Sequence, residues 1–162
     1  MQIDLKAFAR KAKKMQAENV EFFKVLKKTR RGDLQEIVDK HHEAAFEKID
    51  CLSCAGCCKT ISPTFEQDDI HRLAKFLKIK PKDVMTKYLH MDEDGDFVHN
   101  GAPCPFLKGN NYCSVYEARP EACSGYPHTG DKQFRSILDI TLQNTLYCPA
   151  VFEIVENLKK EF

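Results

Sequence analysis

The sequence lacks long apolar runs, since its longest apolar stretches are only a few residues, and this excludes a transmembrane helix. It also lacks an excess of one charge, because 25 Lys and Arg are balanced by 24 Asp and Glu to give a net charge of +1. That balance predicts no general attraction to nucleic acid or to an anionic membrane. The segment from Met1 to Lys6 has no apolar signal core, so we expect a cytoplasmic protein.

Two enzyme fingerprints are also missing. The sequence has no glycine-rich strand–turn–helix motif for a nucleotide-like cofactor, and 162 residues leave little space for one. The Cys-x3-Cys-x2-Cys pattern of radical enzymes that use S-adenosylmethionine is absent, because Ile61 stands where a third cysteine after Cys54 and Cys58 would fall. The sequence therefore does not identify a catalytic residue.

Residues 1–50 contain no cysteine or proline, and their only glycine is Gly32. Apolar residues recur at steps of three and four from Leu5 to Leu26, which predicts a first helix over this stretch. Arg30 and Arg31 before Gly32, with Asp33 as an N-cap, predict that one helix ends and another begins there. We therefore predict a basic N-terminal helical hairpin over residues 1–50, followed by a cysteine-rich domain over residues 51–162.

The positive charge of the chain is concentrated in its first 31 residues. Ten Lys and Arg against three Asp and Glu give this stretch a net charge of 10 − 3 = +7. A basic helix of this kind is usually a solvated face, and contact with an acidic partner or RNA is the alternative. No particular protein partner is indicated by the pattern.

The remainder of the chain indicates a small, mainly α domain with a short β-hairpin. Helices are predicted after a cap at Ser62 or Thr64 through Leu77, from Pro81 to about Leu89, and from Ala150 to Phe162. Met91–Gly95 predicts a turn before a short strand at residues 96–99. Lys108-Gly109-Asn110-Asn111, between two short apolar runs, predicts a hairpin.

Eight cysteines in a chain without an export signal are the strongest chemical feature. In a reducing compartment, thiols more often bind metal than form disulfides. Cys51-x2-Cys54-x2-Cys57 has the two-residue gaps that let thiolates converge on one ion, and Cys58 follows directly. Gly56 is expected to permit the tight turn and a close approach of backbone to sulfur. Because Cys57 and Cys58 are adjacent, we expect them to serve different sites, or one of them to pack in the core.

The later cysteines occur in short segments that fold back on themselves. A two-residue hairpin loop would place Cys104 and Cys113 on one face, whereas a three-residue loop would separate them unless a bulge intervened. Arg119-Pro120 predicts a helical turn that carries Cys123, and Cys148 precedes Pro149. The predicted metal ligands are thus Cys51, Cys54, Cys57, Cys58, Cys104, Cys113, Cys123 and Cys148.

Spacing alone leaves the number of sites and the metal open. Eight thiolates suit two four-cysteine sites, or one such site with buried spare cysteines, and four thiolates suit zinc and an iron–sulfur cluster alike. A disulfide framework and a thioredoxin-like redox pair are the weaker alternatives. Arg119 would either offset thiolate charge or pair with Glu117 or Glu121, and His128 would be a ligand or an exposed turn residue.

At these residues the sequence resembles the YkgJ family of cysteine-cluster proteins. This family has the CxxCxxCC pattern and is also described as a zinc- or iron-chelating domain. The matching motifs are Cys51-x2-Cys54-x2-Cys57-Cys58, Asp69-Ile70-x-Arg72-Leu73-Ala74, Pro103-Cys104-Pro105-Phe106-Leu107, Cys113-Ser-Val-Tyr116-Glu117-x-Arg119-Pro120-x-x-Cys123, Tyr126-Pro127 and Cys148-Pro149. They cover about residues 50–150 in unbroken order. One departure is Ser124, since the family often has Arg at that position.

The resemblance implies that the cysteines chelate metal, with a 4Fe–4S cluster or zinc as the cofactor. It leaves the physiological role undefined. Two alternatives remain: a structural zinc module for protein or nucleic-acid interaction, and an enzyme like the flagellin lysine N-methylases of a related branch. A metal bound by residues as far apart in sequence as Cys58 and Cys104 would hold distant parts of the chain together and so stabilise the fold.

Overall fold

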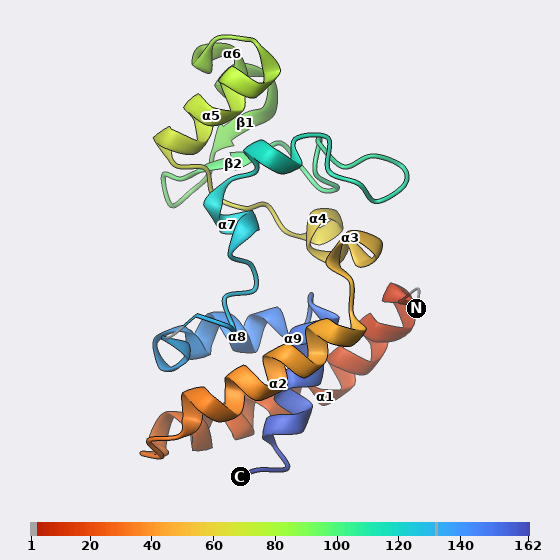
Figure 1. Ribbon diagram of the computed structural model, residues 1–162, viewed down its shortest axis with the longest axis vertical. Coiled ribbons are helices and arrows are strands. Elements are labelled where there is room, and N and C mark those ends of the chain that lie inside the picture. Colours follow the sequence, from red (N-terminus) through yellow and green to blue (C-terminus); the bar gives the residue numbers. More distant parts are fainter. Residues whose placement is uncertain (1–2, 132) are drawn as a thin grey trace. The chain divides into compact units, whose positions relative to one another are not determined.

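The computed structural model describes residues 3–131 and 133–162, and it has a mainly helical fold with a short antiparallel β-hairpin (Figure 1). The predicted fold class is confirmed. Two compact units are formed by the described residues: unit 1 comprises Met1–Gly56 and Pro127–Phe162, and unit 2 comprises Cys57–Tyr126. The predicted boundary after residue 50 stays a prediction about folding domains. Within the described ranges, no helix is both long and apolar enough to cross a bilayer.

The first two helices of unit 1 form where the sequence predicts them. Helix α1 (Leu5–Lys28) begins after Asp4, whose carboxylate accepts hydrogen bonds from two backbone amides of the first turn. Helix α2 (Leu34–Lys48) then runs in the opposite direction (Figure 1). Asp33 occupies the N-cap position of α2, but its carboxylate accepts hydrogen bonds from Arg31 instead of capping an amide. The charged, bidentate guanidinium is the stronger partner.

The C-terminal helix supplies the centre of unit 1. Helix α9 (Pro149–Leu158) packs most extensively against α2, and it also packs against α1 and α8 (Leu138–Asn144). The turn η2 (Phe134–Ile137) leads into α8, and neither element was predicted from the sequence. The apolar side chains buried in this core include Ala12, Phe23, Leu26, Leu34, Val38, Ala45, Phe134, Leu138, Val151, Phe152, Ile154, Val155 and Leu158. The predicted inward face of the last helix is therefore confirmed.

Unit 2 begins with two helices and the β-hairpin. Helices α5 (Gln67–Leu77) and α6 (Pro81–Tyr88) match the predicted segments, and Pro81 opens α6 because its fixed φ suits a first helical turn. Strands β1 (Leu89–Met91) and β2 (Phe97–His99) follow directly. They pair antiparallel around the predicted turn.

The register of this hairpin places Leu89 opposite His99 and Met91 opposite Phe97. The hairpin and both helices enclose the core of unit 2, whose buried residues are Phe65, Ile70, Leu73, Ala74, Val84, Leu89, Phe106, Val115 and Ala118. His99 is also fully buried, although it is polar. The core thus lies mainly against α5, α6 and the hairpin.

The hairpin predicted around residues 108–111 is reduced to a tight turn, and the observed β-hairpin is the one formed by β1 and β2. The amide of Lys108 donates to the carbonyl of Tyr112 (2.8 Å), and a single isolated bridge joins Leu107 to Cys113. Asn111 adopts a left-handed conformation with φ 65°, which closes a three-residue loop. After it come the short 3-10 helix η1 (Tyr116–Ala118), which was not predicted, and the one-turn helix α7 (Glu121–Ser124), which the Arg119-Pro120 pair predicted.

The first cysteine motif is helical and not an open loop. Helix α3 (Cys51–Cys54) is capped by Asp50, whose carboxylate accepts a hydrogen bond from the amide of Leu52 (3.0 Å), and helix α4 (Gly56–Thr60) follows. Ala55 separates the two helices with a left-handed backbone at φ 48°. The tight turn expected at Gly56 is therefore made one residue earlier.

Candidate metal centre

All eight predicted ligands lie among the described residues, and each is a thiol that forms no disulfide. Unit 1 contains Cys51, Cys54 and Cys148, which we call the unit 1 thiol group. Unit 2 contains the other five. Cys54 and Cys148 are buried, Cys51 is exposed, and those of unit 2 are half-buried.

Four thiols of unit 2, Cys58, Cys104, Cys113 and Cys123, come from three separate segments of the chain. We call them the unit 2 thiol group. Cys58 lies on α4, Cys104 and Cys113 flank the tight turn, and Cys123 lies on α7. The amide of Cys104 donates to the carbonyl of Cys58 (2.7 Å), which ties the first motif to the turn. The bridge between Leu107 and Cys113 then fixes the opposite side of the turn.

The charges of these four thiols act on one another. Burial, together with the smaller effect of the neighbouring charges of Cys58, Cys104 and Cys113, raises the pKa of Cys123 to about 12. Burial also raises the pKa values of Cys104 and Cys113, and the charge of Cys58 acts on both. The four thiols, which come from three segments of the chain, are thus close enough for their charges to affect one another.

Cys58 is the most acidic thiol of the group. A hydrogen bond with the thiol of Cys57, whose sulfur lies 4.0 Å away, lowers the pKa of Cys58 to about 7. Burial is the main reason that the other three thiols favour the protonated form, and the charge of Cys58 acts in the same direction. A thiophilic cation would replace those protons, because its charge favours all four thiolates at once.

Backbone amides already point toward the sulfur atoms. Hydrogen bonds from the amides of Phe106 and Leu107 lower the pKa of Cys104, against the larger effect of burial. The amide of Val115 does the same for Cys113. Such amides stabilise the thiolate form and occupy sulfur lone pairs that the metal does not use, so they suit metal-bound cysteines.

The unit 1 thiol group joins two distant segments. Burial raises the pKa of Cys148 to about 11, and the charges of Cys51 and Cys54 contribute to the rise. Gly56 leaves room beside them, because a Cβ there would lie 3.3 Å from the carbonyl oxygen of Tyr147 and 3.4 Å from the sulfur of Cys54. The expected role of Gly56 in close approach is thus present, whereas the tight turn expected there is made by Ala55.

Arg119 lies beside the unit 2 thiol group. Its guanidinium stacks over the ring of Tyr116 at 3.8 Å and donates to the carbonyl of Tyr116 (2.9 Å). Its charge lowers the pKa values of Cys113 and Cys123, against the larger effect of burial. Of the two sequence-based interpretations, the structure favours the guanidinium that offsets thiolate charge.

The histidines have other surroundings. His128 lies in a turn with φ 63°, and its Nδ1 is 3.0 Å from Asp131, so the alternative of a turn residue is confirmed. His99, to which the sequence assigned no role, is fully buried in unit 2, and its Nδ1 lies 3.3 Å from the hydroxyl of Ser62. Burial lowers the pKa of His99. No local sequence pattern distinguishes it from an exposed histidine.

The donor chemistry of the unit 2 thiol group fits zinc or an iron–sulfur cluster, since both accept four thiolates. As the side chains stand, however, no three Cys, His, Asp or Glu side chains in residues 3–131 and 133–162 are arranged to hold a metal ion. The thiols are neighbours that have not converged on one point. Binding would have to draw them together by side-chain rotation and small shifts of the turns.

Comparisons with known proteins agree with this chemistry. The sequence profile of the CxxCxxCC family, described as "Putative zinc- or iron-chelating domain", matches residues 50–149. The uncharacterized protein MJ0661 of Methanocaldococcus jannaschii is 30% identical over 82 residues, which cover 49% of this chain and 44% of that protein. The match thus spans less than half of the relative. No solved structure matches the chain. With a profile that covers well over half of its residues, the chain belongs to the CxxCxxCC family of zinc- or iron-chelating domains.

Proposed function

We propose that the protein binds a 4Fe–4S cluster or zinc through the unit 2 thiol group, Cys58, Cys104, Cys113 and Cys123. The observation that carries the proposal is the backbone contact that holds these segments together: the amide of Cys104 donates to the carbonyl of Cys58 (2.7 Å), and a bridge joins Leu107 to Cys113. Four thiolates brought from three segments complete the ligand set of a closed site, with no position left for a catalytic water. The site would serve electron transfer if it holds a cluster, and the stability of the fold if it holds zinc.

Cys51, Cys54, Cys57 and Cys148 remain predicted metal ligands. Cys51, Cys54 and Cys148 act on one another electrostatically within unit 1, and Cys57 contacts Cys58. With eight thiols that must stay reduced to bind metal, we propose a reducing compartment such as the cytoplasm. Partners other than the metal remain to be identified by experiment.

The identity of the metal can be tested on anaerobically purified protein. Iron with acid-labile sulfide and broad visible absorption would establish a cluster, whereas a colourless protein with stoichiometric zinc would establish the zinc alternative. Both results support the proposed metal site. Protein that contains neither metal, and that acquires neither in anaerobic reconstitution, would overturn it.

The ligand set can be tested with two matched variants. In one variant, Cys58, Cys104, Cys113 and Cys123 are replaced by Ser, and in the other, Cys51, Cys54 and Cys148 are replaced. We expect the first variant to lose the unit 2 metal completely, and the second to retain it. Metal analysis per folded protein measures both. Full retention of metal in the first variant would contradict the proposed ligands.

A further inference from the structure

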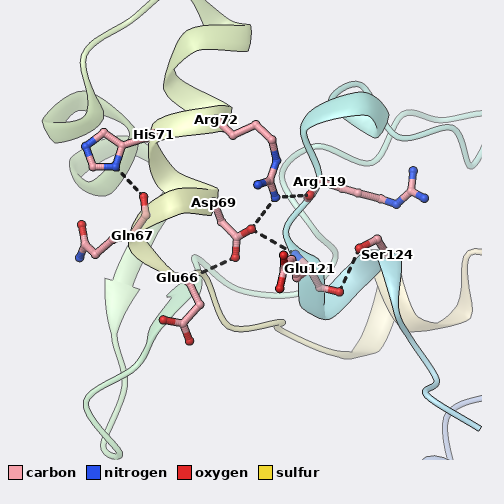
Figure 2. Close-up of polar contacts among 8 residues, drawn as sticks. All are labelled: Glu66, Gln67, Asp69, His71, Arg72, Arg119, Glu121 and Ser124. Carbon is pink, nitrogen blue, oxygen red and sulfur yellow. Dashed lines mark hydrogen bonds and ion pairs between the residues drawn. The ribbon is translucent and has the colours of Figure 1, made fainter. Parts of the chain in front are cut away.

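A buried carboxylate in unit 2 makes more contacts than its own helix requires. Asp69, in the first turn of α5, is 3% exposed. Figure 2 shows three donors around it: the amide of Glu66 at 3.0 Å, the guanidinium of Arg72, and the amide of Glu121 at 3.2 Å. The first contact closes a capping box at the start of α5. The third reaches a residue 52 positions later, which capping does not explain.

Arg72 extends the same connection. Besides its ion pair with Asp69, its guanidinium donates to the backbone carbonyl of Arg119 at 3.0 Å (Figure 2). The two side chains therefore hold one short stretch, residues 119–121, from a carbonyl at one end and an amide at the other. A buried carboxylate is costly unless it is fully paired, so this arrangement is strongly specified.

The stretch held in this way leads directly to a thiol. Helix α7 has four residues and carries Cys123, whose amide donates to the carbonyl of Pro120 at 2.9 Å. A helix of one turn has little stability of its own, because it forms few hydrogen bonds for the residues it orders. Its position must therefore come from contacts with other elements. The contacts from Asp69 and Arg72 supply such an attachment to α5, the longest helix of unit 2.

We propose that Asp69 and Arg72 form a positioning pair for the metal site. They orient residues 119–121 so that the thiol of Cys123 and the guanidinium of Arg119 face the other thiols of the unit 2 thiol group. Asp69 and Arg72 touch no metal themselves. The inference rests on the proposed function, and it assigns these residues of the family motif a role toward one particular ligand.

The test compares metal binding by Asp69→Ala, Asp69→Asn and the wild-type chain. Each is titrated anaerobically with Co²⁺ in the presence of a competing chelator, and the thiolate-to-cobalt absorption reports how many sulfur ligands are bound. We expect Asp69→Ala to bind Co²⁺ about 10-fold to 100-fold more weakly and with lower thiolate absorption, as is usual for residues that orient ligands. Asp69→Asn keeps one acceptor oxygen for Glu121 and should lose less.

Asp33→Ala is the matched control, because it removes another Asp–Arg pair, in unit 1. It should bind Co²⁺ as the wild type does. If Asp69→Ala fails to fold, Arg72→Lys replaces it, since Lys cannot bridge both acceptors in the same geometry and should weaken binding in the same direction.

The outcomes separate the two proposals. Weaker binding with altered absorption supports the positioning role, because a purely structural role would lower the melting temperature and leave the spectrum of the folded, metal-bound protein unchanged. The positioning role alone would be overturned if the folded Asp69 variants bound Co²⁺ with the affinity and spectrum of the wild type. If the Asp69 variants do not fold, the same result in Arg72→Lys would overturn it. A wild-type chain that binds no thiophilic metal would overturn the proposed function, and the positioning role with it.

Discussion

Each unit contains thiols that interact within that unit, but the two units differ in the helices and the apolar core that hold these thiols in place. Unit 1 has helices of 24 and 15 residues and a core to which α1, α2, α8 and α9 all contribute. The longest helix of unit 2 has 11 residues, and its core lies mainly against α5, α6 and the β-hairpin. Residues 100–126 of unit 2 consist of turns, a 3-10 helix and a one-turn helix.

The difference indicates where a metal would matter most. Long amphipathic helices bury enough apolar surface to hold their own positions, whereas short turns do not. Three of the four thiols in the unit 2 thiol group, Cys104, Cys113 and Cys123, lie in this turn-rich stretch. We therefore expect unit 2 to depend on its metal more than unit 1 depends on any ligand.

The largest expected effect is that of metal removal. Stripping the metal anaerobically with a chelator should remove stabilisation on the order of 10 kcal/mol from unit 2, by analogy with structural zinc sites. Amide hydrogen exchange would then show a loss of protection in residues 100–126, while α1, α2 and α9 keep theirs. Equal loss of protection in both units would contradict the expectation that unit 2 depends more on the metal. Unchanged exchange throughout would contradict stabilisation of unit 2 by the metal.

A substitution in the core of unit 1 should lower stability without changing the metal content. Phe23 is 1% exposed, and Phe23→Ala should lower the free energy of unfolding by about 3–5 kcal/mol because it leaves a cavity. Metal content per folded protein should stay unchanged. Val25→Ala on the same helix is the control, since Val25 is 51% exposed and its loss should change stability by less than about 0.5 kcal/mol. Denaturant unfolding and metal analysis measure the two effects. Loss of metal in folded Phe23→Ala would show that the units are coupled.

The smallest expected effect is a pH dependence of unit 2. Burial lowers the pKa of His99 below its ordinary value of 6.5, and the charge of His90 acts in the same direction. The unfolded chain therefore takes up a proton first as pH falls, so stability present above pH 6.5 is lost below it, with a slope of at most about 1.4 kcal/mol per pH unit.

His99→Gln should remove that part of the pH dependence, and His71→Gln on the exposed face of α5 should not. Urea unfolding between pH 5 and pH 8, a range chosen to bracket the ordinary histidine pKa of about 6.5, measures both variants. An unchanged slope in His99→Gln would rule out His99 as the titrating group.

The helices with a clear apolar period could be predicted from the sequence. Val151, Ile154, Val155 and Leu158 recur at helical spacing, and all four are buried on α9. The same local signal identified α5 and α6. It failed for η2 and α8, which have short apolar patterns. It also placed the tight turn at Gly56 instead of Ala55. The close approach of Tyr147 and Cys54 to Gly56 is visible only in the folded chain.

The sequence by itself determined the helical class, the family and the thiol chemistry, because periodicity, motif order and side-chain type are properties of the chain as written. Only the tertiary structure decided that Cys58 neighbours Cys123, that Cys148 neighbours Cys51 and Cys54, and that Asp69 reaches Glu121. Those neighbours are separated by tens of residues. They meet because the packing of helices and turns brings the segments together, and no local pattern records that packing.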